Sequence, residues 1–202
     1  MRPEDILPTY ERVARGYAAS RDKTLFERRW LDRMLNFAPG RRVLDIGCGP
    51  GRPIAEYLLD RRCVVTGVDG APAMVALFRQ NLPGADCIRS DMRGLNLGRR
   101  FDALLAWDSF FHLSPGDQRE MFPTFAAHAA PRAVLMFTSG PDAGEPIGRV
   151  EGEPVYHASL SPDEYRACLD AAGFDVVDFK PEDPTCAGHS VWLARKRRDE
   201  DA

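Results

Sequence analysis

Three glycines at alternate positions follow an acidic residue near the start of the chain. Residues 43–51 read VLDIGCGPG, an apolar run that ends in Asp45 and then in a loop. Glycine lacks Cβ and tolerates positive φ, so it is used where a backbone turns sharply or where something approaches it closely. If such a loop precedes a helix, its amide groups can bind a carboxylate or a phosphate. The residues therefore predict a strand that ends at a ligand-binding loop.

Two further acids end the next two short runs of the chain. Asp69 ends the run Val64–Asp69, and Asp91 ends the run Asp86–Asp91. A carboxylate after a second strand can accept hydrogen bonds from both ribose hydroxyls. An acid after a third strand can accept a hydrogen bond from the exocyclic amine of a base. Together with the glycine loop, the acids predict a nucleoside-type ligand at one edge of a sheet.

A fourth apolar run, Phe101–Asp108, leads into a segment that carries proton-accepting side chains. Residues 107–112 read WDSFFH and would lie at and just past the end of this strand, where a second substrate can reach them. Tyr156, Phe110 and Phe111 would form an aromatic acceptor pocket or belong to the core. Another histidine, His128, falls on an expected helix and is expected to be solvated. A general base is needed only if the nucleophile is protonated, and the candidates are Asp108, His112, His157 and His189.

The elements that position these residues alternate between strands and helices. Such alternation predicts an open, mostly parallel sheet covered on both faces, with ligands bound beyond the carboxyl ends of the strands. The expected strands are Arg42–Gly47, Val64–Asp69, Asp86–Asp91, Phe101–Asp108, Ala133–Thr138, Phe174–Phe179 and Ser190–Ala194. The expected helices are Pro53–Leu59, Pro72–Leu82, one that begins at Ser114 and one that begins at the capping box Ser161–Glu164 and ends at Gly173.

One domain spans residues 1–202, with two additions to the sheet. Apolar residues recur at helical spacing before Pro39, which predicts an N-terminal helical cap over residues 1–38. The segment Gly140–Pro154 is rich in glycine and proline and long for a compact domain. We expect it to belong to a lid-like insertion over residues 140–158 that excludes water together with the cap. Residues 196–202 are expected to be a disordered tail.

The composition is that of a globular protein without a strongly charged surface. The 202 residues are 44% hydrophobic and 28% charged, and the net charge of −3 does not attract nucleic acid or an anionic membrane. No apolar run approaches the ~20 residues of a membrane helix, and no signal-peptide pattern begins the chain. Five cysteines without a C-x-x-C pair indicate reduced thiols. We expect a cytoplasmic monomer or homodimer whose partner is a small molecule, with no nucleic acid and no membrane.

The chain resembles the class I S-adenosylmethionine (SAM)-dependent methyltransferases, in their small-molecule branch, from about Tyr10 to Arg195. Residues 43–51 match the first motif of that family, Val68-Asp69 its ribose-binding acid, Ser90-Asp91-Met92 its adenine-binding segment and residues 101–107 its fourth-strand motif. The resemblance implies an α/β fold with a doubly wound, Rossmann-like, seven-stranded, mostly parallel sheet whose last strand is antiparallel. It also implies in-line transfer of the SAM methyl group to an O, N, C or S nucleophile of a small-molecule acceptor, with S-adenosylhomocysteine (SAH) as product.

The resemblance also implies roles for individual residues. The glycine loop would hold the methionine part of SAM, and Asp45 would grip the loop and the SAM amino group. Asp69 would hold the ribose, and Tyr17 would close over the methionine carboxylate. Adenine would be read at Asp91 and Met92. The expected cofactor-binding residues are Tyr17, Asp45, Gly47, Gly49, Gly51, Asp69, Met74, Asp91, Met92 and Trp107, and the expected catalytic residues are Asp108, His112 and His157; no metal ligand is expected.

Two other classes of protein stay open. An NAD(P)-dependent oxidoreductase has the fingerprint G-x-G-x-x-G, whereas here the third glycine, Gly51, comes one residue early. A non-catalytic SAM-binding module would carry the same motifs, because a fold does not fix a function. A nucleic-acid methyltransferase is disfavoured, because WDSF stands after the fourth strand in place of an Asn/Asp-Pro-Pro-aromatic motif.

Overall fold

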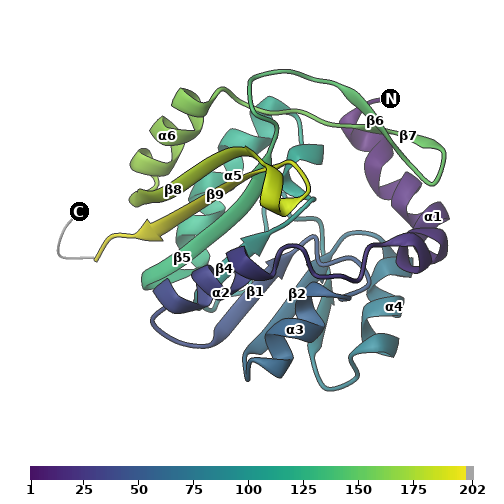
Figure 1. Ribbon diagram of the computed structural model, residues 1–202, viewed down its shortest axis with the longest axis horizontal. Helices are drawn as coiled ribbons and strands as arrows, with labels where there is room; N and C mark the ends of the chain where they lie inside the picture. The colour runs from purple at the N-terminus through teal and green to yellow at the C-terminus, as the bar shows by residue number, and fades with distance from the viewer. Residues whose placement is uncertain (199–202) are drawn as a thin grey trace.

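A seven-stranded sheet in the order β3-β2-β1-β4-β5-β9-β8 forms the centre of the computed structural model, which describes residues 1–198 (Figure 1). Strands β1 to β5 pair in parallel, and β9 pairs antiparallel with both β5 and β8. This confirms the predicted doubly wound, mostly parallel sheet with an antiparallel last strand. The strands are β1 Arg42–Ile46, β2 Val64–Asp69, β3 Asp86–Arg89, β4 Phe101–Ala106, β5 Ala129–Ser139, β8 Phe174–Asp183 and β9 His189–Lys196.

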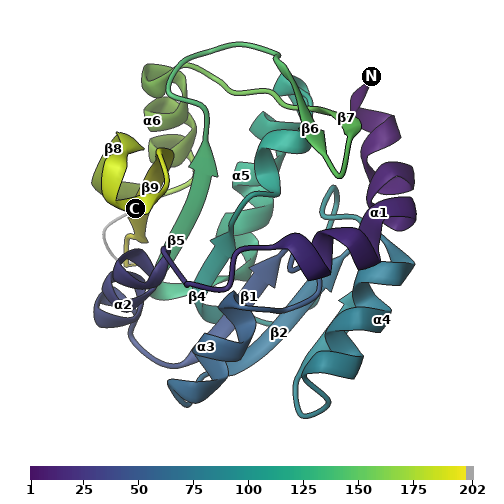
Figure 2. The same ribbon diagram turned by 45° about the vertical axis from the view of Figure 1, so that its right-hand side comes forward.

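Helices cover both faces of the sheet, as Figure 2 shows. On one face, α2, α3 and α4 share an apolar cluster that includes Leu31, Leu58 and Phe78. On the other face, α5 and α6 share a cluster that includes Phe122 and Leu169. Burying one such side chain stabilises the fold by ~1.5–3 kcal/mol, so the two clusters fix the strand ends that carry the site. These helices are α2 Arg28–Phe37, α3 Ile54–Asp60, α4 Pro72–Asn81, α5 Pro115–His128 and α6 Pro162–Ala171.

The two helices that follow predicted caps begin where the sequence indicates. The Ser114 hydroxyl accepts a hydrogen bond from the amide of Asp117 at 3.1 Å, and the Ser161 hydroxyl accepts one from Glu164 at 3.2 Å. Each bond satisfies one of the amide groups that a helix start leaves unpaired. The cap at Ser114 starts α5 directly after the segment that carries Asp108 and His112, so it fixes where that segment ends.

Strand β5 begins earlier than the pattern predicts. Ala129 already pairs with Phe101, and the register then shifts before Ala103 pairs with Val134. The shift accommodates Pro131, which cannot donate to the ladder, and Arg132, whose φ is +65°. A proline followed by a left-handed residue carries no strand signal, so the sequence pattern identifies only the regular part of β5.

The first part of the N-terminal cap lies beside the 140–158 segment. The cap consists of the 3-10 helix η1 Pro3–Asp5, α1 Ile6–Ser20 and, after a break, α2. The segment expected to be a glycine-rich connection contains a hairpin, β6 Ile147–Val150 and β7 Glu153–Tyr156, whose turn at Glu151 and Gly152 has positive φ. Arg12 of α1 bonds Glu153 at 3.2 Å, and Ser20 donates to Glu151 at 2.6 Å. Both views place the hairpin along α1.

The end of the described chain is tied to the sheet. Strand β9 continues through Lys196, and Arg197 bonds Asp170 with its side chain and Gly173 with its amide. The predicted tail therefore does not begin at residue 196, and its last part, residues 199–202, lies outside the described residues. Within residues 1–198, no helix is long and apolar enough to cross a membrane.

Candidate functional site

The glycine loop after β1 adopts a left-handed backbone that favours glycine at three positions. Gly47, Gly49 and Gly51 have φ values of +74°, +52° and +80°. A Cβ on Gly47 would lie 2.2 Å from the Cβ of Ser109, and one on Gly51 would lie 2.8 Å from Phe78. A Cβ on Gly49 would meet only Tyr17, at 3.9 Å. Gly47 and Gly51 are therefore required by packing, whereas the open side of Gly49 faces the pocket.

Asp45 is a buried carboxylate without a partner. It lies on β1 directly before the loop and is 4% exposed. Among residues 1–198, no side chain or amide donates a hydrogen bond to it. Burial, with a smaller contribution from the charge of Asp69, raises the pKa of Asp45 to about 7. A buried charge without a partner is costly, so this position fits a cationic group of a ligand.

Asp69 ends β2 and holds the glycine loop. Its two carboxylate oxygens accept hydrogen bonds from the amides of Gly49 and Ala71, both at 2.9 Å. Burial raises the pKa of Asp69 above its ordinary value, against the lowering effect of these amides. Each oxygen retains acceptor capacity, so the carboxylate can also bind hydroxyl groups that enter the pocket.

Asp91 lies in the same pocket but pairs with a neighbour. Its carboxylate is 2.6 Å from the guanidinium of Arg93 and also accepts the Arg93 amide. Although burial raises it, the hydrogen bonds from Arg93 hold the pKa of Asp91 below its ordinary value. A base bound here would share Asp91 with Arg93, while Met92 lines the pocket next to it.

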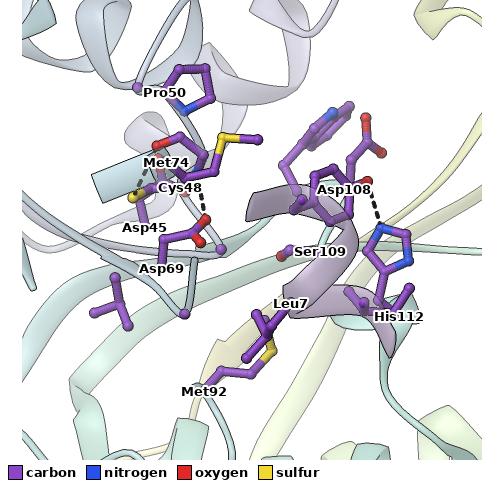
Figure 3. A pocket seen from close by; sticks show the side chains of 18 of the residues that line it. Leu7, Asp45, Cys48, Pro50, Asp69, Met74, Met92, Asp108, Ser109 and His112 are labelled. Atoms are coloured by element: carbon purple, nitrogen blue, oxygen red, sulfur yellow. Dashed lines mark hydrogen bonds between the residues drawn. The ribbon is translucent and has the colours of Figure 1, made fainter. Parts of the chain in front are cut away.

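One pocket brings together every residue expected to bind the cofactor. Figure 3 shows Asp45, Cys48 and Asp69 on one side of this pocket and Asp108, Ser109 and His112 on the other. The predicted residues that line it are Tyr17, Asp45, Gly47, Gly49, Gly51, Asp69, Met74, Asp91, Met92 and Trp107, joined by Asp108 and His112.

Arg21 also lines this pocket, and sequence reasoning missed it. It follows α1 and is paired with Glu27, which is fully buried. The ion pair holds the Arg21 guanidinium beside Tyr17. The Tyr17 ring in turn lies next to Gly49 of the glycine loop. No local pattern marks Arg21, because its position depends on a contact between two segments of the cap.

A second pocket adjoins the first and shares four side chains with it. These are Tyr10, Tyr17, Asp108 and His112. The second pocket also contains His157, from the segment that follows β7, and His189, from the start of β9. Phe111 lines it, whereas Phe110 is fully buried in the core. The structure therefore brings the three expected catalytic residues, Asp108, His112 and His157, to one cavity beside the expected cofactor site.

His112 is buried with both ring nitrogens occupied. Nδ1 is 2.8 Å from the carbonyl of Tyr156, which can only accept, so Nδ1 carries the proton. Nε2 is 2.9 Å from the Tyr10 hydroxyl and accepts its proton. Burial lowers the pKa of His112 to about 4, against the raising effect of the Tyr156 carbonyl. His112 is therefore neutral, and it orients the Tyr10 oxygen toward the cavity.

The expectation that His128 is solvated is wrong. His128 is 3% exposed, and it lies on the face of α5 that packs against the segment before β4. Its Nδ1 is 2.8 Å from the carbonyl of Thr124, and its Nε2 accepts the amide of Leu97 at 3.0 Å. The histidine satisfies the backbone of an irregular segment, a role that helical spacing alone does not reveal. Within the described chain, no cluster of three or more acidic, histidine or cysteine side chains could hold a metal ion.

Comparison with known sequences matches the part of this site between residues 43 and 132 to a methyltransferase domain. Residues 43–132 match the family model described as a methyltransferase domain. A trans-aconitate 2-methyltransferase from Methylobacterium nodulans is 32% identical over 152 residues, which cover 67% of this chain and 58% of that protein. A protein of the same name from Escherichia coli K12 is 35% identical over 96 residues, covering 46% and 36%. The chain thus spans less than two thirds of the length of these curated relatives.

Solved structures share the fold over nearly the whole chain. CalS10 from Micromonospora echinaspora, described as an amino pentose methyltransferase with bound SAM, has a TM-score of 0.70 at 24% identity, with 93% of this chain and 96% of that chain covered. The CcbJ methyltransferase from Streptomyces caelestis has a TM-score of 0.74 at 18% identity, with 92% and 96% covered. The fold is therefore the Rossmann-like fold of these methyltransferases. Together, the matched domain, the sequence relatives and the shared fold support a class I SAM-dependent methyltransferase.

Proposed function

We propose that the protein binds SAM in the first pocket and transfers its methyl group to a small-molecule acceptor in the second. The observation that carries this proposal is the convergence of Asp45, Asp69 and the glycine loop on one pocket that opens, past Asp108 and His112, into another. A binding module needs only the first pocket, so the adjoining polar cavity favours an enzyme.

The residues of the first pocket fit SAM by charge and hydrogen-bonding capacity. Asp45 is a buried, unpartnered carboxylate that an ammonium group would neutralise. Asp69 would accept the ribose hydroxyls, and Arg21 with Tyr17 would receive the methionine carboxylate. Met74 would pack against adenine. When bound, SAM supplies a methyl group on a positively charged sulfur.

The second pocket would hold the acceptor in line with the methyl group. Proximity and orientation supply much of the rate in such a displacement. We propose that Asp108 and His112 contact the acceptor at the junction and that His157 accepts a proton from the methylated product. The curated relatives are named for trans-aconitate, so this acid is the first acceptor to test.

Calorimetric titration tests the cofactor assignment. Wild-type protein should bind SAM and SAH, and Asp69→Ala should raise the Kd for SAM by about 10- to 100-fold, because hydrogen bonds to a charged group contribute ~1.5–3 kcal/mol. Asp170→Ala is the control, since Asp170 lies on α6 and pairs with Arg197. Unchanged SAM affinity in Asp69→Ala would contradict the assignment of Asp69 to the ribose. Absence of SAM binding by the wild type would contradict the proposed function.

We further propose that the protein acts in the cytoplasm as a monomer or a homodimer. The cysteines are all free, and none is committed to a disulfide, which suits a reducing compartment. Sedimentation of the full chain with and without SAH decides between one copy and two.

A further inference from the structure

His189 and Asp108 form an ion pair at the acceptor pocket whose protonation state follows from its contacts. Nε2 of His189 lies 3.0 and 3.2 Å from the two carboxylate oxygens of Asp108. Nδ1 lies 2.9 Å from the carbonyl of Cys186. Both partners can only accept, so both nitrogens must donate, and only the imidazolium has two N–H groups. His189 is therefore the cation of the pair.

Two aromatic rings pack on this imidazolium. The ring centroid of Trp107 is 5.4 Å from that of His189 at an interplanar angle of 28°, and that of Phe26 is 5.3 Å away at 32°. An aromatic face attracts a cation, so the packing favours the same protonation state. Burial alone would lower the pKa of His189, but the hydrogen bond and charge of Asp108 outweigh it and raise that pKa above its ordinary value.

Asp108 is held at the junction of the two pockets by a strained backbone. Its φ is +48°, which a non-glycine residue adopts at a cost of ~1–3 kcal/mol. Its amide donates to the hydroxyl of Thr138 at 2.9 Å, which fixes this conformation. The carboxylate lines both pockets. The fold thus places a paired carboxylate where the methyl group would meet the acceptor.

The other titratable groups at the junction are poorly suited to remove a proton before methyl transfer. His112 uses both ring nitrogens, and the Tyr10 hydroxyl donates to it. Burial raises the pKa of Tyr10 far above its ordinary value and raises that of Tyr17 to about 12. His157 has ring nitrogens without a partner in the described chain, but burial lowers its pKa. A hydroxyl acceptor needs a strong base, and a carboxylate acceptor would face the carboxylate of Asp108. An amine that enters the pocket as the neutral base, having left its proton in water, attacks through its own lone pair and needs no base at that step.

We propose, building on the methyltransferase function, that the acceptor is an amine and that the His189 imidazolium is a positioning residue that holds the Asp108 carboxylate against the amine nitrogen. As the N–CH3 bond forms and the S–CH3 bond breaks, the positive charge moves from sulfur to nitrogen. The sulfur keeps the electron pair of the broken bond, and the nitrogen becomes R–NH2⁺–CH3. Asp108 stabilises this developing ammonium charge. The product then gives one proton to His157 or to water and leaves as R–NH–CH3.

The charge state of His189 can be tested without any acceptor. Long-range ¹⁵N–¹H NMR of the imidazole rings in the full chain should show His189 protonated on both nitrogens at pH 7 and His112 protonated on Nδ1 alone. Asp108→Asn should move the titration of His189 to lower pH. Besides Asp108, the acids near His189 are Glu27, which Arg21 neutralises, and Glu182 in the same pocket. A neutral His189 at pH 7 overturns the proposal.

The acceptor class is tested by transfer of a CD3 group from labelled SAM. The panel pairs small primary amines with their hydroxyl analogues and adds carboxylic acids, including trans-aconitate. Label on nitrogen supports the proposal. Label only on oxygen, or no transfer to any amine while SAM is bound, overturns the amine class but leaves SAM binding intact. Failure to bind SAM at all would instead remove the proposed function.

Two substitutions separate positioning from simple stability. With the best amine, Asp108→Asn should lower kcat by about 100-fold, and His189→Gln should lower it about 10-fold, both with the KM for SAM within about 2-fold of wild type. His128→Gln is the matched control, since His128 is also buried and bonded through both nitrogens but lies outside both pockets. It should lower Tm and leave kcat unchanged. Equal kcat for His189→Gln and wild type contradicts the positioning role.

Discussion

Replacing Asp45 by asparagine should stabilise the ligand-free protein while weakening SAM binding. Burial raises the pKa of Asp45 to about 7, from an ordinary value of 3.8. Because the pKa of Asp45 is raised in the folded state, the carboxyl lowers the free energy of unfolding by nothing below about pH 4. Its cost to stability grows as pH rises from there and is complete above about pH 7. Above that pH the ionised carboxylate costs about 4 kcal/mol, from roughly 3 pKa units at ~1.36 kcal/mol each.

The asparagine side chain has nearly the same shape and no charge, so Asp45→Asn removes this cost. Urea unfolding without ligand should show a free energy of unfolding higher than wild type by up to about 4 kcal/mol at pH 8, with the difference vanishing near pH 4. For SAM, loss of a charged hydrogen bond should raise the Kd by about 10- to 100-fold.

Asp102 provides a control of opposite sign. It is also largely buried, but hydrogen bonds from Arg42 hold its pKa below its ordinary value, although burial raises it. Its stability contribution is therefore present above pH 4 and lost as pH falls, so Asp102→Asn should destabilise the protein at pH 8. If Asp45→Asn gives no gain in the free energy of unfolding at pH 8, or a gain that does not depend on pH, Asp45 is not a buried carboxylate without a partner.

Three further outcomes follow from the same geometry. Gly47→Ala should lower the free energy of unfolding by more than about 2 kcal/mol, and Gly98→Ala by about 1 kcal/mol, because both have positive φ but only Gly47 would clash; urea titrations compare them. SAM binding at pH 7 should release protons as Asp45 ionises, which calorimetry in buffers of different ionisation enthalpy detects; binding without proton release would count against the ammonium contact. Amides of α1 and of the β6–β7 hairpin should exchange hydrogen more slowly with SAH and acceptor bound than in the free protein, and unchanged exchange would remove the lid function of residues 140–158.

Much of the cofactor site is predictable because its signals are local. The apolar run before Asp45, the alternate glycines and the acid at Asp69 each mark a strand end, and the rule that ligands bind at the carboxyl ends of parallel strands places those ends together. Pairing of β1 with β2 and β4 confirms that arrangement.

The rest of the site depends on contacts between distant segments. Tyr10 reaches His112 across 102 positions of sequence, and His189 reaches Asp108 across 81. Neither pairing leaves a periodic pattern in the sequence. The sequence therefore indicates candidate bases, but not which of them are already hydrogen-bonded to other residues. The hairpin turn at Glu151-Gly152 carries no Asn-Gly or Asp-Gly signal, so the glycine and proline content around it indicates only a connection.

A crystal structure with SAH tests the central claim most directly. We predict that the amino group lies within hydrogen-bond distance of Asp45, that the ribose hydroxyls meet Asp69, and that the sulfur points toward Asp108 and the second pocket. SAH bound elsewhere, or reversed so that adenine lies at the glycine loop, would contradict the account.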